Sequence, residues 1–212
     1  LDRASVSSPT SFVWPAESDE TTHLSVVDAD RNAVAMTYTL EGGYGSMMVV
    51  PGAGFLLNNE MGDFNAAPGL TTADGLIGTD PNLAMPGKRM LSSMTPTILA
   101  RDGQLYMVTG SPGGRTIINT VLHTVMNVID FGMNAQDAID APRFHHQWLP
   151  DRVQYERNGL SPDTLAILTA LGHTFAPIGS QGVAEAIVVN WKEGKLEGGA
   201  DRRAPDGGAV GY

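Results

Sequence analysis

At Thr21-Thr22-His23-Leu24-Ser25-Val26 the 212-residue chain changes from a polar segment to alternating apolar residues. One interpretation is a β-strand whose Thr and Ser side chains lie on its solvated face. The other is a threonine that becomes a chain terminus after cleavage between Glu20 and Thr21. A hydroxyl nucleophile needs an adjacent base, and the freed α-amine of the same residue, whose unperturbed pKa is about 8, can serve. Both interpretations start a strand at Thr21, and the second adds a catalytic nucleophile.

Alternating apolar residues predict three β-hairpins, and the first of them begins at this stretch. Before it, residues 5–20 are rich in Ser, Pro, Thr and acidic side chains, which indicates an extended tail. The hairpins are expected over 23–40 with a turn at Asp30-Arg31-Asn32, over 97–109 with a turn at Arg101-Asp102-Gly103, and over 184–198 with a turn near Glu193-Gly194. Each run is apolar enough for an inner sheet.

Three helices are predicted in the second half of the chain. Residues 113–131 carry a wide apolar stripe at helical spacing, so we expect this helix to be buried against a sheet. The other two are expected over 134–141 with Asn134 as N-cap, and from Ser161-Pro162 to a point before Gly172. Hairpins, then helices, then more strand indicate an α+β layered domain. The Gly-, Pro- and Asn-rich segment 52–89 is predicted to be a functional or disordered loop.

Composition excludes several classes of protein. The net charge is -10, and no basic run is longer than Lys88-Arg89 or Arg202-Arg203, which argues against a nucleic-acid partner or an anionic membrane surface. The absence of cysteine excludes disulfides and thiolate metal sites. No apolar run approaches the roughly 18 residues of a membrane span. Charged residues make up only 17% of the chain, which fits either surface hidden against another chain or an abundance of Gly-rich loops.

Three further motifs carry possible chemistry. Ser92-Ser93 before a predicted strand is either a polar turn or a pair of hydroxyls that binds a carboxylate. Gly113-Gly114 at a strand-to-helix junction is either a tight turn or a source of unpaired N–H groups that stabilise an oxyanion. Its motif lacks the Lys of a nucleotide-binding Walker loop. Glu60 and Asp63 indicate either a solvated helix face or a clamp for a substrate ammonium.

Taken together and in this order, these stretches resemble the γ-glutamyltransferase family. The match runs from Glu17 to the ending Gly211-Tyr212 and includes Pro142-Arg143-Phe144-His145-His146-Gln147-Trp148-Leu149-Pro150. The resemblance implies the αββα sandwich of N-terminal-nucleophile hydrolases, an α+β fold of which this chain supplies part. It also implies a precursor that cuts itself before Thr21. Residues 1–20 are then the C-terminal tail of the large subunit, and residues 21–212 are the small, catalytic subunit.

The resemblance also implies the reaction and the site. Thr21 attacks the γ-glutamyl amide of glutathione or a related compound, and water or the amine of an amino acid or peptide then takes the γ-glutamyl group. Each remaining role falls on a matching residue. Thr39 supports the nucleophile, Gly113 and Gly114 form the oxyanion hole, Glu60 and Asp63 hold the α-ammonium, and Ser92 and Ser93 bind the α-carboxylate. No metal or cofactor is required, and His145 and His146 are structural in this frame.

Two positions depart from the family pattern. Glu41 stands where many relatives carry Asn, among the groups that contact the carboxylate end of the substrate. A carboxylate there repels a substrate carboxylate unless it points away or is protonated. Asp74 replaces an aromatic residue that closes the pocket lid in some bacterial members, and the matching loop here is Gly69 to Asn82. An Arg that the family uses for the substrate carboxylate lies in the large subunit.

Two alternative functions stay open. One is an amidase like the cephalosporin acylases, which share the fold and the nucleophile. The other is a degenerate homologue that stays uncleaved and only binds a ligand or partner. With Glu20 still joined to Thr21 there is no free amine to act as base, so we expect little activity from the isolated chain. Family members work outside the cytoplasm, which predicts a periplasmic or secreted location.

Overall fold

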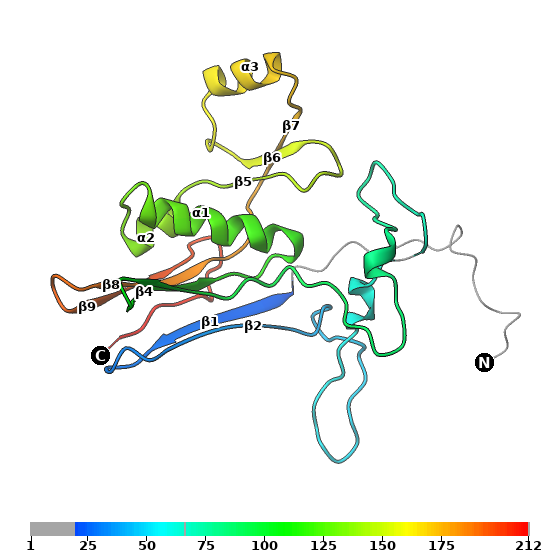
Figure 1. Cartoon of the computed structure of the whole chain (residues 1–212), viewed down its shortest axis with the longest axis horizontal. Coiled ribbons are helices and arrows are strands. Elements are labelled where there is room, and N and C mark those ends of the chain that lie inside the picture. Colours follow the sequence, from blue (N-terminus) through cyan, green and yellow to red (C-terminus); the bar gives the residue numbers. More distant parts are fainter. Residues whose placement is uncertain (1–19, 66, 212) are drawn as a thin grey trace, which may run out of the picture.

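The computed structural model describes residues 20–65 and 67–211, so the extended tail expected before Glu20 lies outside the described residues. Strands and helices are mixed, as expected for an α+β domain (Figure 1). The strands are β1 (Thr21–Val27), β2 (Ala33–Thr39), β3 (Thr97–Arg101), β4 (Gln104–Gly110), β5 (Phe144–His145), β6 (Val153–Glu156), β7 (Phe175–Ile178), β8 (Glu185–Asn190) and β9 (Lys195–Ala200). The α-helices are α1 (Ile117–Ile129), α2 (Ala135–Asp140) and α3 (Pro162–Ala170), and the 3-10 turns are η2 (Glu60–Asp63), η3 (Asp80–Asn82) and η4 (Gly114–Thr116).

The three predicted hairpins are confirmed. β1 pairs with β2, β3 with β4 and β8 with β9, all antiparallel. β4 also pairs with β8, which joins two of the hairpins into one sheet of order β3-β4-β8-β9. The turns contain residues with left-handed backbone, such as Arg31, Asp102 and Gly194. Polar turn residues and glycine accept this conformation at low cost, so each turn lies where the sequence indicated it.

The elements form layers of helix, sheet and sheet (Figure 1). α1 and α2 cover one face of the four-stranded sheet, and the β1-β2 hairpin packs against its other face through contacts with β4 and β8. The core lies between the helices and the sheet and contains Met107, Val128, Ala135, Ala138, Ile139, Ala184, Ala186 and Val188. This is the αββα order predicted for the family, without a second helix layer among residues 20–65 and 67–211.

Helix α1 packs one side of its apolar stripe against the sheet. Ile117, Val121 and Val128 face the core and Val125 is partly buried against it, whereas four apolar side chains of the stripe are exposed: Ile118, Leu122, Met126 and Ile129. A straight helix buries only one side against a sheet, and the predicted stripe is wider than that side. The predicted packing of this helix against a sheet is therefore confirmed, and an apolar face of α1 is left on the surface.

The shorter helices begin and end as predicted. The Asn134 side chain accepts a hydrogen bond from the Asp137 N–H at 2.8 Å, and the Ser161 hydroxyl accepts one from the Thr164 N–H at 3.1 Å. Both are N-caps that satisfy an otherwise unpaired helix donor. α3 ends just before Gly172, whose φ of 100° stops the helix.

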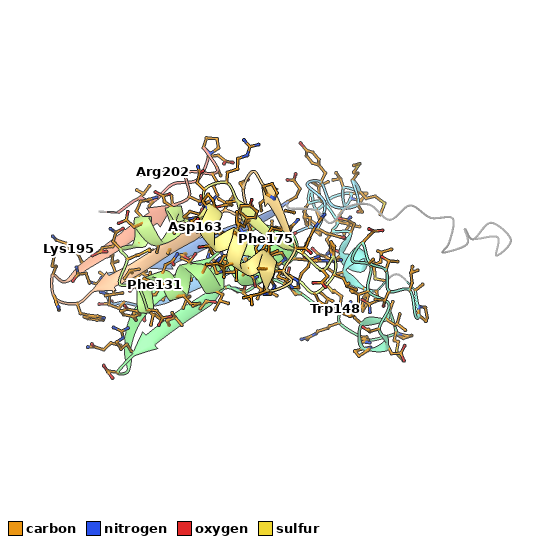
Figure 2. All side chains as sticks on the ribbon, turned by 90° about the horizontal axis from the view of Figure 1, so that it is seen from above. Phe131, Trp148, Asp163, Phe175, Lys195 and Arg202 are labelled. Atoms are coloured by element: carbon orange, nitrogen blue, oxygen red, sulfur yellow. The ribbon has the colours of Figure 1, made fainter. Side chains whose placement is uncertain are left out.

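A small sheet of order β5-β6-β7 was not predicted. β6 and β7 are parallel and α3 connects them. Seen from above, the unit that carries Asp163 and Phe175 lies over the helix layer, far from the β8-β9 turn at Lys195 (Figure 2). Strands of two to four residues are too short to show alternation, which is why sequence periodicity missed them.

Two arginines, Arg143 buried and Arg203 partly buried, tie this unit to the C-terminal segment. Arg143 is 1% exposed and pairs with Asp201 at 2.7 Å, and Arg203 pairs with Glu156 at 2.6 Å. Arg203 also reaches Asp201 at 3.0 Å. Each charge therefore has an opposite partner, as buried ion pairs require. Among its described residues, the loop segment 52–89 contains the turns η2 and η3 and isolated bridge residues at Leu56, Asn65 and Leu83. No helix in the part of the chain that the structure describes is long and apolar enough to cross a membrane.

Candidate active site

The register of the first hairpin brings Thr21 and Thr39 together. Thr21 opens β1 and its Cα partner across the pair is Thr39 at the end of β2. The Thr39 hydroxyl donates to the Glu20 carbonyl at 3.4 Å and accepts from the Glu41 N–H at 2.8 Å. Thr39 therefore contacts the carbonyl of the peptide bond that joins Glu20 to Thr21. This end of the hairpin also faces the start of α1 and the long loops (Figure 1).

One small pocket gathers nearly all of the predicted site residues. Its lining comes from the first hairpin, from η2, from the segment before β3 and from the start of the helix layer. The lining residues are Thr21, Thr39, Glu41, Glu60, Asp63, Ser92, Ser93, Met94, Gly114 and Ile117. Of the nine predicted residues only Gly113 is missing, and it directly precedes Gly114. Segments that are far apart in sequence thus meet at the Thr21 end of β1.

Gly113 and Gly114 have backbone conformations that favour glycine. Their φ angles are 132° and 53°, and η4 begins at Gly114. A Cβ on Gly113 would lie 2.9 Å from Thr116 Oγ1 and 3.0 Å from Gly182 Cα. The first N–H groups of a helical turn have no partner within the turn and suit an anion. The loop therefore places two glycines with positive φ at the start of a helical turn beside the pocket.

The two serines are bonded differently. The Ser93 hydroxyl donates to the Gly114 carbonyl at 2.8 Å, which links this serine to the glycine loop. The Ser92 hydroxyl accepts from the Met94 N–H at 3.2 Å, a bond that leaves its own O–H to donate. Ser92 is thus ready to donate to a carboxylate, whereas Ser93 must first turn away from Gly114.

Three carboxyl groups line one side of the pocket. Burial raises the pKa of Glu60, and the negative charges of the neighbouring Asp63 and Glu41 raise it further, to about 7. Burial also raises the pKa of Glu41 and of Asp63, the former with help from Asp63. Glu60 Oε1 and Glu41 Oε2 are buried and have no hydrogen-bond partner among the described residues. A cationic ligand would supply both the missing charge and the missing donors.

Glu41 points toward the other two carboxyl groups rather than away from the pocket. Its φ is 69°, a left-handed conformation, and its carboxylate accepts a hydrogen bond from the Gly62 N–H. A Cβ on Gly62 would overlap this carboxylate. Glu41 is thus accommodated because residue 62 is glycine, and burial raises the pKa of its carboxyl group.

The loop from Gly69 to Asn82 is attached to the glycine loop. Arg115 Nη1 donates to the Gly75 carbonyl at 2.9 Å, and the Arg115 charge lowers the pKa of Asp63 against the effect of burial. Asp74, next to Gly75, is exposed. Sequence reasoning missed Arg115, although its position directly after Gly113-Gly114 was a usable signal.

The histidine pair His145-His146 is held by local polar contacts. His145 Nε2 lies 2.8 Å from Gln147 Oε1, and His146 Nε2 lies 3.1 Å from Asp151 Oδ1. Within the described residues no group of three His, Cys, Asp or Glu side chains is arranged to hold a metal ion. Both histidines lie outside the lining of the Thr21 pocket.

Comparison with known proteins identifies the family. The model of the gamma-glutamyltranspeptidase family matches residues 2–211. A glutathione hydrolase proenzyme from Escherichia coli K12 is 51% identical over 198 residues, which cover 93% of this chain and 34% of that protein. The chain thus spans about a third of the length of the first glutathione hydrolase proenzymes that it matches.

Solved structures agree with this assignment. The gamma-glutamyltranspeptidase from Pseudomonas nitroreducens in complex with L-DON is 45% identical, with a TM-score of 0.78, and the match covers 90% of this chain and 100% of that chain. A cephalosporin acylase from Bacillus halodurans is more distant, at 29% identity and a TM-score of 0.75, over 90% of this chain and 34% of that one. The chain therefore belongs to the gamma-glutamyltranspeptidase family, whose N-terminal-nucleophile hydrolase fold it shares.

Proposed function

We propose that this chain carries the nucleophile and most of the donor site of an enzyme that transfers or hydrolyses γ-glutamyl groups of glutathione and related amides. The observation that carries the proposal is the single pocket that joins Thr21 to three carboxyl groups, Ser92 and Gly114. An α-amino acid presents one ammonium and one carboxylate. The pocket offers carboxylates for the first and a hydroxyl donor for the second.

The first step is cleavage of the precursor before Thr21. The Thr21 hydroxyl attacks the Glu20 carbonyl carbon, the C–N bond breaks, and the Thr21 nitrogen takes a proton. Water then hydrolyses the ester and leaves a Glu20 carboxylate and a free Thr21 α-amine. The Thr39 hydroxyl, 3.4 Å from the Glu20 carbonyl oxygen, supports this step because it donates to the oxygen on which negative charge develops.

The second reaction uses the freed amine. The amine takes the proton of the Thr21 hydroxyl, whose oxygen attacks the γ-carbonyl of the donor. N–H groups of Gly113 and Gly114 stabilise the oxyanion, and the leaving amine takes the proton. Water, or the amine of an amino acid or peptide, then releases the γ-glutamyl group from Thr21. No metal or cofactor enters either step.

The domain assignment follows the same proposal. Residues 1–20 belong to the tail of the large subunit, and residues 21–212 form the small subunit. Two exposed apolar faces argue that another part of the protein packs against this chain. One is the outer face of α1, and the other is the outer face of the first hairpin, which exposes Val26, Val34, Met36 and Tyr38. We infer that the remaining part of the precursor covers both faces, and that the enzyme works in the periplasm or outside the cell, as the family predicts.

Intact mass spectrometry of the full-length precursor and of its Thr21→Ala variant tests the nucleophile. Cleavage before Thr21 in the parent and its loss in the variant is the expected result. A parent that stays intact through long incubation would instead favour the degenerate, non-catalytic homologue.

Substrate class is tested on the matured protein. Turnover of a γ-glutamyl anilide should exceed that of a glutaryl anilide, which lacks the α-ammonium. The reverse preference would favour the acylase-like alternative, because the three carboxyl groups would then have no ammonium to hold.

A further inference from the structure

Asn82 connects two segments that line the pocket, the turn η2 and the chain before β3. It ends the turn η3 inside the long loop and is 9% exposed. Its Nδ2 donates to the Asp63 carbonyl at 2.7 Å and to Asn65 Oδ1 at 3.2 Å. Its Oδ1 accepts from the Leu91 N–H at 2.9 Å. A single amide therefore bonds the backbone of a carboxylate-bearing residue and the backbone beside Ser92.

These contacts fix the distance between the segment at Asp63 and the segment at Leu91, which no helix or sheet of the described residues fixes. Among the residues described between Asp63 and Leu91, the regular structure is limited to η3 and a bridge between Asn65 and Leu83. The Asn65 N–H also donates to the Asn82 carbonyl at 2.9 Å, so both the main chain and the side chain of Asn82 are bonded. A buried amide with all of these partners is costly to disrupt, and it holds the two segments in one arrangement.

We propose that Asn82 is a positioning residue that sets the separation between the Asp63 carboxylate and the hydroxyls of Ser92 and Ser93. The inference rests on the proposed function, in which the first of these groups holds the ammonium of the donor and the others its carboxylate. Both charges sit on one α-carbon, so the two sets of protein groups must keep a fixed spacing. Asn82 itself does not line the pocket; it bonds the main chain of Asp63, which does, and it acts only through the residues it bonds.

A positioning role and a merely structural role predict different results. If Asn82 only stabilised the loop, its replacement would lower the yield of matured protein and affect all substrates equally. A positioning role leaves cleavage before Thr21 intact, because Glu20, Thr21 and Thr39 lie outside the loop. With a positioning role, replacing Asn82 weakens the binding of donors that carry both an ammonium and a carboxylate more than the binding of donors that carry only the carboxylate.

The test compares Asn82→Ala and Asn82→Asp with the parent in the full-length precursor. Asn82→Asp keeps the acceptor for Leu91 N–H and loses the donor to the Asp63 carbonyl, so it separates the two bonds. Asn127→Ala is the matched control, because its amide bonds the Ala138 carbonyl at 3.0 Å between helices away from the pocket. Cleavage is followed by intact mass, and kcat and KM are measured for γ-glutamyl and glutaryl anilides.

We expect both Asn82 variants to mature, and Asn82→Ala to lose about 10- to 100-fold in kcat/KM for the γ-glutamyl anilide, mainly through KM. The glutaryl anilide should lose less than threefold, and Asn127→Ala should match the parent. If the parent is active and Asn82→Ala has the same KM as the parent, the positioning role of Asn82 is overturned but the proposed function stands. The same holds if Asn82→Ala loses kcat/KM equally for both anilides. A parent that cleaves neither itself nor the γ-glutamyl anilide overturns the proposed function, and this assignment with it.

Discussion

Replacing Gly110 with alanine should force the strand that carries Thr21 away from the central sheet. Gly110 ends β4, and His23 projects onto it from β1, two residues after Thr21. A Cβ on Gly110 would lie 2.6 Å from His23 Nε2 and would overlap the neighbouring ring atoms. His23 is 5% exposed, and burial lowers the pKa of its imidazole to about 4, so the ring is neutral at pH 7.

The cost of the added methyl group follows from what the ring must give up. His23 Nδ1 lies 2.8 Å from Thr37 Oγ1, and Nε2 lies 3.0 Å from Ser25 Oγ. If the ring moves, both bonds break, at about 0.5–1.5 kcal/mol each. Overpacking adds about 1–3 kcal/mol. We therefore expect Gly110→Ala to lower the free energy of unfolding by about 2–6 kcal/mol and to slow cleavage before Thr21.

Urea unfolding of the precursor, followed by far-UV circular dichroism, measures this change through the midpoint. Gly179→Ala is the control, because a Cβ there meets no atom within 4 Å and the φ of Gly179 is outside the left-handed region. In a double variant with His23→Ala the alanine at 110 should cost much less than in the parent. Additive effects of the two substitutions, or a midpoint equal to that of the control, would refute the reasoning.

Three further outcomes are expected. Thr39→Val removes the hydroxyl at the scissile carbonyl and should slow self-cleavage about 100-fold, with recovery in Thr39→Ser; a mass-spectrometric time course at the parent rate would contradict this role. Because the pKa of Glu60 is raised to about 7, its carboxylate is protonated below that pH, so KM for a γ-glutamyl donor should rise as the pH falls from about 8 to 6, and Glu60→Gln should flatten the profile. Arg143→Met leaves the buried Asp201 without this ion-pair partner and should lower the free energy of unfolding, measured in urea, by about 3–5 kcal/mol. Arg202→Met, at the exposed ion pair with Asp140, should lower it by at most about 1 kcal/mol. Equal losses of stability would argue against a contribution from the buried pair.

Local patterns predicted the elements that depend on local interactions. The alternation on both sides of Asp30-Arg31-Asn32 specified the first hairpin, and its register alone paired Thr21 with Thr39. The caps Asn134 and Ser161 act on donors three residues away, so the helix starts could be located without knowledge of the rest of the chain.

Elements that depend on distant partners were missed or misjudged. The sheet formed by β5, β6 and β7 needs a parallel pairing across α3, and short strands leave no periodic signal. The ion pair of Arg143 with Asp201 joins residues 58 positions apart. The apolar stripe of α1 correctly predicted a helix, but the burial of each side chain depends on what packs against it, and Ile118, Leu122, Met126 and Ile129 stay exposed.

The sequence by itself determined the three hairpins, the helix starts, the nucleophile motif and the family, because these follow from local spacing and from ordered motifs. Only the tertiary structure decided that four separated segments share one pocket and that Glu41 turns toward Glu60 over Gly62. The raised pKa of Glu60 and the bridging role of Asn82 also depend on it. The physical reason is that desolvation, charge–charge interaction and hydrogen bonding across a loop depend on distances between atoms, which residue order alone does not specify.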